Sequence, residues 1–357
     1  MTLRVALVGG PMYDHLYTLL RDRDVEVVVH ADHPTLNREV AARLAAGERL
    51  DVISTHSKYA PSQAQWLHPL DGLVDVDALA PLAVGLCRFD GAQFCVPRLI
   101  DVRILWARRD RLAQVPDTWA DVIDQAVSFG FPGRESGLFG TFFELVVGAG
   151  GRLFDDDGRP CLVSPESESA VATLCALAAN APADLPTWHY DQVDRALLDG
   201  TVDAAGAWPG AWGPIRDSAL AELLEPHPYP AGPVRRVSYA GCHAWAVPRT
   251  CVDVAAALEL VRTLTGAEAN ALDASGGNVC AHTAAFAAVE PSSDLDRRRL
   301  AITAHTIADA MITYPPHPRF PELEDAGWQS INDALRGERS PRNAVEEMQC
   351  TAERVVT

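Results

Sequence analysis

The sequence predicts an α/β protein in which helices cover a parallel sheet. Strand-like and helix-like segments alternate from the start of the chain, which is the order of a parallel sheet with helical crossovers. The chain has 357 residues, enough for two domains of ordinary size. Apolar residues make up 48% of it, as in globular proteins. No apolar run approaches the roughly eighteen residues of a membrane helix.

The first five elements carry the fold-class prediction. Strands are expected at 3–9, 25–30 and 50–54, and helices at 12–22 and 35–46. The strands are short apolar runs rich in valine, and Gly47 ends the second helix. The β-α-β-α-β order implies right-handed crossovers, so the three strands should be parallel.

The remaining elements follow from turn and cap signals. Asp90-Gly91 is a hairpin turn signal, and Thr118 is the N-cap of a helix. Further strands are expected at 94–97, 101–106 and 241–248, and further helices at 137–148, 165–179, 189–199 and 253–265. The tail, 294–357, should be helical with a proline-rich break at 314–318.

Charge and missing motifs exclude several functions. The net charge of −18 leaves no basic stripe for nucleic acid. Gly9-Gly10-Pro11 follows the first strand but lacks the third glycine of the dinucleotide fingerprint. No nucleophile elbow, zinc-protease or Walker motif occurs. We therefore expect no catalytic residues and no cofactor.

The sequence also predicts no metal site. The eight cysteines form no C-x-x-C pair, so no zinc ribbon is indicated. Cys87 and Cys95 flank the hairpin turn and are interpreted as small buried residues, with a cross-strand disulfide as the alternative. His30-Ala31-Asp32-His33 is interpreted as a surface loop, with a metal-binding histidine pair as the alternative.

The segment Ala207–Gly213 carries two tryptophans around a Pro-Gly turn and follows a short apolar strand. Open α/β sheets place ligands at the carboxyl ends of their strands. An indole held there is a flat apolar platform for the C–H face of a sugar or polyol. Trp208 and Trp212 are therefore candidate ligand contacts, and packing in a core is the alternative for each.

Several segments, taken in order, resemble the extracellular solute-binding proteins of ABC importers, in the carbohydrate-binding class similar to maltose-binding protein. The resemblance runs nearly end to end, and no single piece of it is specific. The segments that carry it are 50–57, 66–71, 90–97, 101–106, 117–121, 150–154, 198–204, 327–337 and 344–348.

The resemblance implies a two-lobed periplasmic-binding-protein-like (type II) fold with an inter-lobe cleft and crossing hinge strands. Lobe 1 would comprise residues 1–106 and 246–305, and lobe 2 residues 107–245 and 306–357. Such a protein captures a sugar or polyol by hinge closure and delivers it to the permease subunits of an ABC transporter, with no reaction catalysed. A monomer is expected. The location implied is periplasmic or at the cell surface, although residue 1 leads directly into a strand rather than a signal segment.

Candidate ligand residues lie where the expected elements meet this cleft. His56 and Ser57 follow a strand end, whereas Asp101 and Arg103 share a strand face and could instead form a structural ion pair. Glu144 lies on an otherwise apolar helix, as a ligand acceptor or simply exposed. The full set is Tyr13, His56, Ser57, Asp101, Arg103, Glu144, Trp208, Gly210, Trp212, Tyr239, His243 and Asn278.

Two further functions stay open at this point. The same fold could bind a small acidic sugar or another anion through Arg103, whose guanidinium can grip a carboxylate in a bidentate manner. A two-lobed α/β enzyme is the other alternative, and it requires a carboxylate pair or an activated nucleophile in the cleft.

Overall fold

The computed structural model describes residues 1–356, which form two compact units. Unit 1 consists of Met1–Asp101, Gly241–Glu290 and Tyr314–Phe320. Unit 2 consists of Val102–Ala240, Pro291–Thr313 and the chain from Pro321 onward. These units are clusters of packed residues, and the lobe boundaries given above stay a prediction.

Three parallel strands begin unit 1, as the sequence predicts. Strand β1 (Leu3–Val8) pairs in parallel with β2 (Val25–Ala31) on one side and with β3 (Val52–His56) on the other. Every residue of β3 is buried, because helices cover both faces of a parallel sheet. The predicted β-α-β-α-β order is therefore confirmed.

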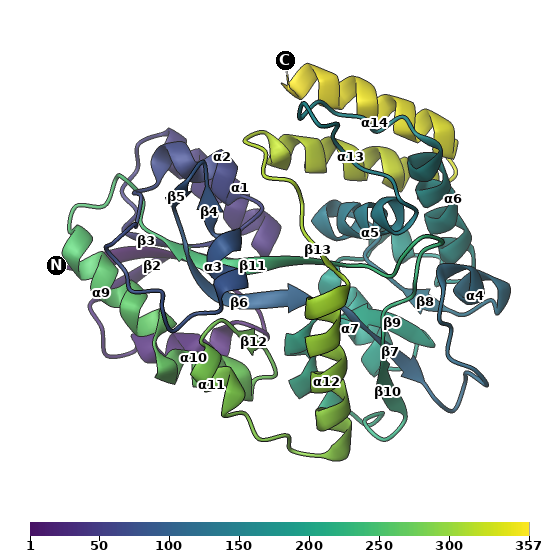
Figure 1. Ribbon diagram of the computed structural model, residues 1–357, viewed down its shortest axis with the longest axis horizontal. Helices are drawn as coiled ribbons and strands as arrows, with labels where there is room; N and C mark the ends of the chain where they lie inside the picture. Colours follow the sequence, from purple (N-terminus) through teal and green to yellow (C-terminus); the bar gives the residue numbers. More distant parts are fainter. Residues whose placement is uncertain (357) are drawn as a thin grey trace. The chain divides into compact units, whose positions relative to one another are not determined.

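The sheet of unit 1 continues beyond β3 in the order β12-β6-β11-β3-β1-β2. Figure 1 shows α1 and α2 on one side of these strands and α9 and α10 on the other. The other elements with residues in this unit are the 3₁₀ helices η1 (Asp14–Leu20) and η2 (Ala64–Trp66), strands β4 (Arg88–Phe89), β5 (Ala92–Gln93), β6 (Val96–Val102), β11 (Ser238–Ala246) and β12 (Val279–Cys280), and helices α1 (His33–Ala45), α2 (Ala60–Gln63), α3 (Pro81–Leu86), α9 (Val254–Thr265), α10 (Ala267–Ser275) and α11 (Thr283–Ala287).

Unit 2 is built around a four-stranded sheet of order β10-β7-β9-β8 and the buried helix α5 (Glu135–Gly148). Strand β13 (Met311–Ile312) pairs with the part of β11 that belongs to this unit. The remaining elements are β7 (Ile104–Arg108), β8 (Phe129–Gly130), β9 (Ala204–Ala207) and β10 (Leu224–His227), helices α4 (Trp119–Asp124), α6 (Pro165–Ala179), α7 (Tyr190–Leu198), α8 (Trp212–Arg216), α12 (Asp294–Asp309), α13 (Phe320–Leu335) and α14 (Pro341–Val356), and the 3₁₀ helices η3 (Leu185–Thr187) and η4 (Pro209–Ala211).

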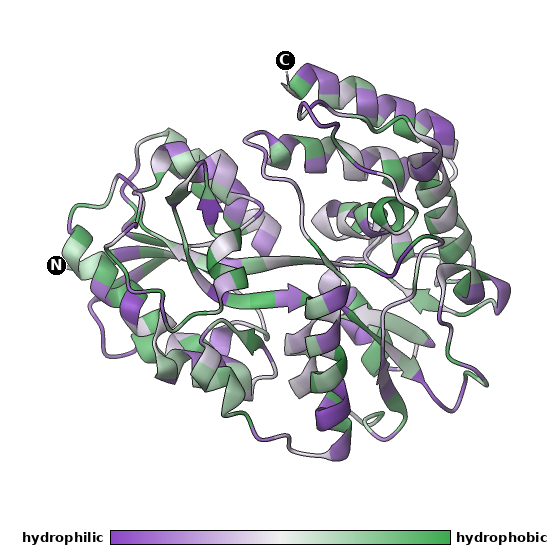
Figure 2. Ribbon diagram, in the orientation of Figure 1, coloured by the Kyte–Doolittle hydropathy of each residue, from purple (hydrophilic) through white to green (hydrophobic). Residues whose placement is uncertain are grey.

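Helix α5 shows why the core of unit 2 forms where it does. All of its residues from Ser136 to Gly148 are buried, as expected for a mostly apolar helix that is packed on every side. Figure 2 shows α5 mainly in green and α14 mainly in purple, as expected for a core helix and a surface helix. Helix α4 begins at the predicted cap, where Thr118 and Asp121 form a capping box.

Two local differences from the sequence prediction concern element type and length. The expected helix at 12–22 is the shorter 3₁₀ helix η1, whose N-cap Tyr13 provides no side-chain cap. Strand β11 starts at Ser238 rather than at 241, because it also pairs with β13. No helix within residues 1–356 combines the length and the apolar character that a membrane crossing requires.

Candidate functional site

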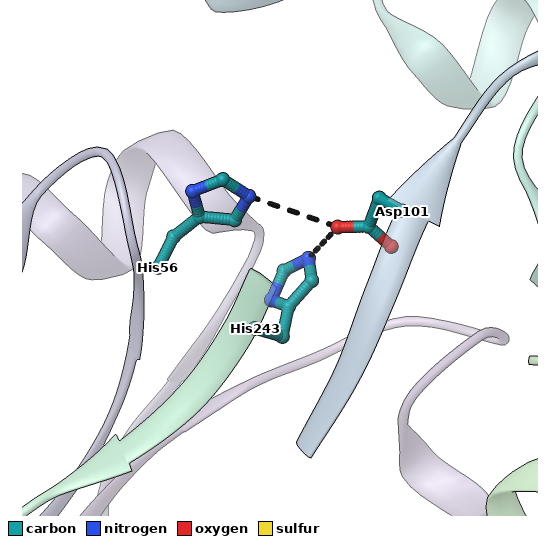
Figure 3. A group of neighbouring side chains, drawn as sticks. All are labelled: His56, Asp101 and His243. Carbon is teal, nitrogen blue, oxygen red and sulfur yellow. Dashed lines mark ion pairs between the residues drawn. The ribbon is translucent and has the colours of Figure 1, made fainter. Parts of the chain in front are cut away.

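Three neighbouring strands of unit 1 bring His56, Asp101 and His243 together (Figure 3). His56 ends β3, and His243 lies directly opposite it on the antiparallel strand β11. Directly opposed residues project from the same face of a sheet, so the two imidazoles meet. Asp101 comes from β6, the strand on the other side of β11.

One carboxylate oxygen of Asp101 faces both imidazoles. Its Oδ2 lies 3.2 Å from Nε2 of His243 and 3.7 Å from Nε2 of His56. The three side chains are 5–9% exposed, so little water reaches them. We call Tyr13, His56, Asp101 and His243 the unit 1 cluster, because the Tyr13 hydroxyl completes the group 3.1 Å from Nε2 of His243.

The surroundings set the charges of this cluster. Burial alone would raise the pKa of Asp101, but His243 and His56 beside it lower that pKa to about 2. Burial lowers the pKa of His56 to about 4, against the opposing effect of Asp101. At neutral pH the carboxylate is therefore ionised and the His56 imidazole is neutral.

Ser57 and Asn278 support the cluster through the backbone. The Ser57 N–H donates to the Cys242 carbonyl at 2.8 Å, and its hydroxyl accepts the Cys242 N–H at 3.1 Å. The Asn278 amide donates to the Met12 carbonyl at 3.1 Å, next to Tyr13. Both predicted residues thus hold the segments that carry His243 and Tyr13.

Sequence reasoning missed His33, Lys58 and Tyr59, which surround the same cluster. The His33 ring lies 5.2 Å from that of His56 and 5.1 Å from that of His243, and it stacks on Tyr59. The Lys58 ammonium lies 4.8 Å from the Tyr59 ring centre. The sequence did contain a signal for His33, because it lies just after β2, at the same edge of the sheet where His56 ends β3. The interpretation of 30–33 as a surface loop is wrong, because His30 and Ala31 end β2, His33 begins α1, and only Asp32 lies between them as the helix N-cap.

In unit 2, Arg103 pairs with Glu144 and not with Asp101. The guanidinium binds both carboxylate oxygens, Nε contacting Oε1 at 3.3 Å and Nη2 contacting Oε2. Its two Nη groups also donate to the Thr141 hydroxyl at 3.2 and 3.3 Å. Oε1 of Glu144 further accepts the Tyr239 N–H at 2.7 Å. We call Arg103, Thr141, Glu144 and Tyr239 the unit 2 cluster.

Glu144 is fully buried, so the reading of it as an exposed residue is wrong. Burial raises the pKa of Glu144 to about 7, although Arg103 and the Tyr239 N–H act in the opposite direction. The carboxylate is therefore close to its titration point at neutral pH while its hydrogen bonds are already satisfied within the unit.

The two tryptophans of the Ala207–Gly213 segment have different surroundings. Trp208 is half-buried, with the rings of Tyr190 and Tyr239 at 6.3 and 6.0 Å and the Arg103 guanidinium at 5.4 Å. Trp212 is 4% exposed and stacks on Trp106 at 6.0 Å. Trp208 thus offers more free surface to a ligand than Trp212 does. Gly210 is buried in η4.

His56, Asp101 and His243 could also hold a metal ion. One potential donor atom from each lies within 4.8 Å of the others, and no other group of this kind occurs in the described part of the chain. Sequence analysis gave no metal site because the three residues lie far apart in the chain.

Cys87 and Cys95 do not form the cross-strand disulfide that the sequence left as an alternative. Both thiols are free and buried, as the first interpretation predicted.

Comparison with known proteins identifies the fold. Maltose-bound MalE3 of T. maritima superposes with a TM-score of 0.87 at 20% identity, over 99% of both chains. An ABC-transporter solute-binding protein of Agrobacterium radiobacter K84, in complex with ribitol, gives 0.87 at 19% identity over 99% of this chain and 98% of that one. A solute-binding protein of Thermotoga lettingae TMO, bound with α-D-tagatose, gives 0.84 at 18% identity over all of both chains.

These similarities confirm the predicted α/β fold of the two-lobed periplasmic-binding-protein type. The sequence itself matches the family described as bacterial extracellular solute-binding protein over residues 21–271, well over half of the chain. The unit 1 cluster falls partly outside that span, at Tyr13, while its other three members fall within it. The chain belongs to the bacterial extracellular solute-binding protein family.

Proposed function

We propose that this chain is the solute-binding component of an ABC importer and captures a sugar or polyol. Membership of the solute-binding family and the fold shared with maltose-, ribitol- and tagatose-bound proteins support this proposal. The protein acts outside the cytoplasm as a monomer. It delivers its solute, chemically unchanged, to the permease subunits in the membrane.

The observation that carries the proposal is the unit 1 cluster itself. Four of the residues predicted to bind ligand come together there, although they lie in four separate segments of the sequence. A phenol, two imidazoles and a carboxylate offer both donors and acceptors, which is what an array of hydroxyl groups requires. Each well-placed hydrogen bond to a charged group contributes about 1.5–3 kcal/mol.

Unit 2 carries a candidate apolar platform of its own. Trp208 keeps part of its ring exposed between Tyr190 and Tyr239, and an exposed indole face stacks on the C–H face of a sugar ring. Arg103 is not needed as a ligand group, because its guanidinium already donates to Glu144 and Thr141. This pairing favours a neutral solute over an acidic one.

A thermal-shift screen of the purified protein against monosaccharides, oligosaccharides, polyols and sugar acids tests the proposal. A solute at one hundred times its dissociation constant stabilises the fold by about 2.7 kcal/mol. We expect a shift from at least one neutral sugar or polyol, recovered chemically unaltered. W208A and H243Q should each weaken that binding about tenfold or more, equivalent to about 1.4 kcal/mol.

W328A is the matched control, since Trp328 is also half-buried but its indole N–H is bonded to Asp325 on α13. It should leave the affinity unchanged. A screen in which no sugar or polyol shifts the transition, or in which the hit is consumed, contradicts the proposal. A hit confined to sugar acids and lost in R103A would instead establish the anion-binding alternative.

A further inference from the structure

The geometry of the unit 1 cluster points to a second ligand of different chemistry. We propose that His56, Asp101 and His243 bind one divalent transition-metal ion of the zinc class. This inference goes beyond the proposed function and does not depend on it.

Two of the three donor spacings fit such an ion, and the third, between the two imidazole nitrogens, is at most 4.8 Å. Ligands of a tetrahedral zinc ion at about 2.0–2.1 Å are roughly 3.3 Å from one another. Asp101 Oδ2 lies 3.2 Å from Nε2 of His243 and 3.7 Å from Nε2 of His56, so both distances are within a few tenths of an ångström of that value. Both imidazoles already point their Nε2 atoms at the same oxygen (Figure 3).

The donor set is also that of a zinc-class site. Imidazole nitrogen suits zinc, copper, iron and nickel, whereas calcium and magnesium require oxygen ligands. Two imidazoles and one carboxylate supply three ligands and leave a fourth position open, as in zinc sites that bind a further molecule. A hydroxyl or water oxygen can occupy that position.

The sheet supplies the rigidity that such a site needs. All three ligands stand on adjacent strands, and His56 and His243 are fixed opposite each other by the β3–β11 register. Sites built on strands hold their geometry better than sites on loops. All three side chains are buried, so little side-chain entropy remains to be lost on binding.

The surroundings of the second ring nitrogen, Nδ1, in each of the two histidines limit the affinity for the metal ion. Nδ1 of His56 accepts the Lys58 N–H at 3.2 Å, which places the proton of the neutral ring on Nε2. Binding through Nε2 moves this proton to Nδ1 and ends that contact. Nδ1 of His243 is buried and has no hydrogen-bond partner within residues 1–356. Metal-bound histidines usually donate from the second nitrogen, and losing such a partner costs 10–100-fold in affinity. We therefore expect an ion that a chelator removes readily.

The test uses the whole protein after treatment with EDTA and dialysis. Titration with CoCl₂ should give visible d–d bands of a low-symmetry site that saturate at one ion per chain, and ZnCl₂ should bleach them. D101N and H56Q should each weaken zinc binding by more than about tenfold in calorimetry, as expected for loss of a direct ligand. H243Q serves as a further ligand variant should either of these fail to give a cooperative thermal transition.

H305Q is the matched control, because His305 forms an exposed pair with Asp309 at 2.8 Å on α12. It should bind zinc like the parent protein. Absence of both the cobalt bands and a heat of zinc binding overturns the inference, as does binding that D101N, H56Q and H243Q leave unchanged. Sugar binding by the EDTA-treated protein is measured separately, so a failed metal site and a failed solute site give different results.

Discussion

Among the buried acidic side chains of the two units, Glu144 in unit 2 and Asp101 in unit 1 are satisfied in different ways. Glu144 in unit 2 receives a bidentate guanidinium and a backbone N–H, and its partner Arg103 is bonded to Thr141 as well. Asp101 in unit 1 faces two imidazoles, one at 3.2 Å and the other at 3.7 Å. Removing one partner of a fully bonded buried pair is costly, whereas a carboxylate with fewer bonds remains available to an incoming ligand. The difference suggests a structural role in unit 2 and a binding role in unit 1.

Removing one charged side chain from each cluster should give the largest difference between the two units in the free energy of unfolding. R103A removes the shared donor of the buried Glu144 and Thr141, and Glu144 must then take up a proton or remain an unpaired buried charge. We therefore expect a loss of about 3–5 kcal/mol in the free energy of unfolding. D101N keeps the shape and one acceptor of its side chain but loses the charge that the imidazoles stabilise, so its loss should be smaller, about 2 kcal/mol. Urea unfolding followed by circular dichroism measures both.

R297A is the control for the variants R103A and D101N, because Arg297 and Asp294 form an exposed ion pair on α12. Its effect should stay within about 0.5 kcal/mol. If D101N proves as destabilising as R103A, the Asp101 carboxylate is structural and the contrast between the two clusters disappears.

The pH dependence of stability sharpens the account of unit 2. Burial raises the pKa of Glu144 from 4.5 to about 7, so the folded protein holds this proton more tightly than the unfolded chain does. The stabilisation is fully present below pH 4.5 and is lost as the pH rises through 7, by up to about 3 kcal/mol. E144Q lacks this titration, so the stability of the parent protein relative to E144Q should fall between pH 5 and pH 8.

The free energies of unfolding of the parent protein and E144Q, measured at several pH values, test whether the difference falls as the pH rises. E346Q, at an exposed position on α14, should run parallel to the parent protein. A constant difference between parent and E144Q, or one that grows with pH, would mean that Arg103 outweighs burial and keeps Glu144 ionised throughout.

Two glycines probe how tightly each cluster is packed. A methyl group at Gly241 would overlap the His56 imidazole. One at Gly206 would overlap the ring of Tyr229, whose centre lies 5.2 Å from the Arg103 guanidinium of the unit 2 cluster. G241A and G206A should each cost about 1–3 kcal/mol from overpacking. Only G241A should also weaken zinc and solute binding, because it displaces a proposed ligand.

G85A is the control, as Gly85 lies in α3 with no atom near the added methyl, and it should be neutral or slightly stabilising. Calorimetry and thermal unfolding of the three variants make the comparison. Equal ligand affinities in G241A and G206A would show that His56 does not contact the ion or the solute.

Much of unit 1 could be predicted because its parallel strands occur in sequence order. The ends of β1, β2 and β3 reach the same sheet edge, so the positions of Tyr13 and His56 follow from local patterns. The partnership of His56 with His243 could not be predicted, since it depends on how β11 pairs with a strand about 190 residues earlier in the chain.

The partner of Arg103 could not be predicted for a related reason. Spacing along one strand suggested Asp101, two residues away, but the packing of α5 against the strands brings Glu144 instead. Trp208 and Trp212 likewise look equivalent in the sequence, and only tertiary packing buries one of them against Trp106. Local patterns thus located the sheet edges, while side-chain partners depended on long-range packing.

Lys58 is the only lysine in the chain, so apart from the amino terminus it is the only aliphatic primary amine. Its side chain is buried beside Tyr59, and it follows His56 by two residues. An acylating reagent therefore finds one internal target, and its rate is governed by local opening of this edge of the sheet. Mass spectrometry after acylation can thus report the fraction of protein molecules in which a ligand protects the unit 1 cluster, and the natural sequence needs no engineered label.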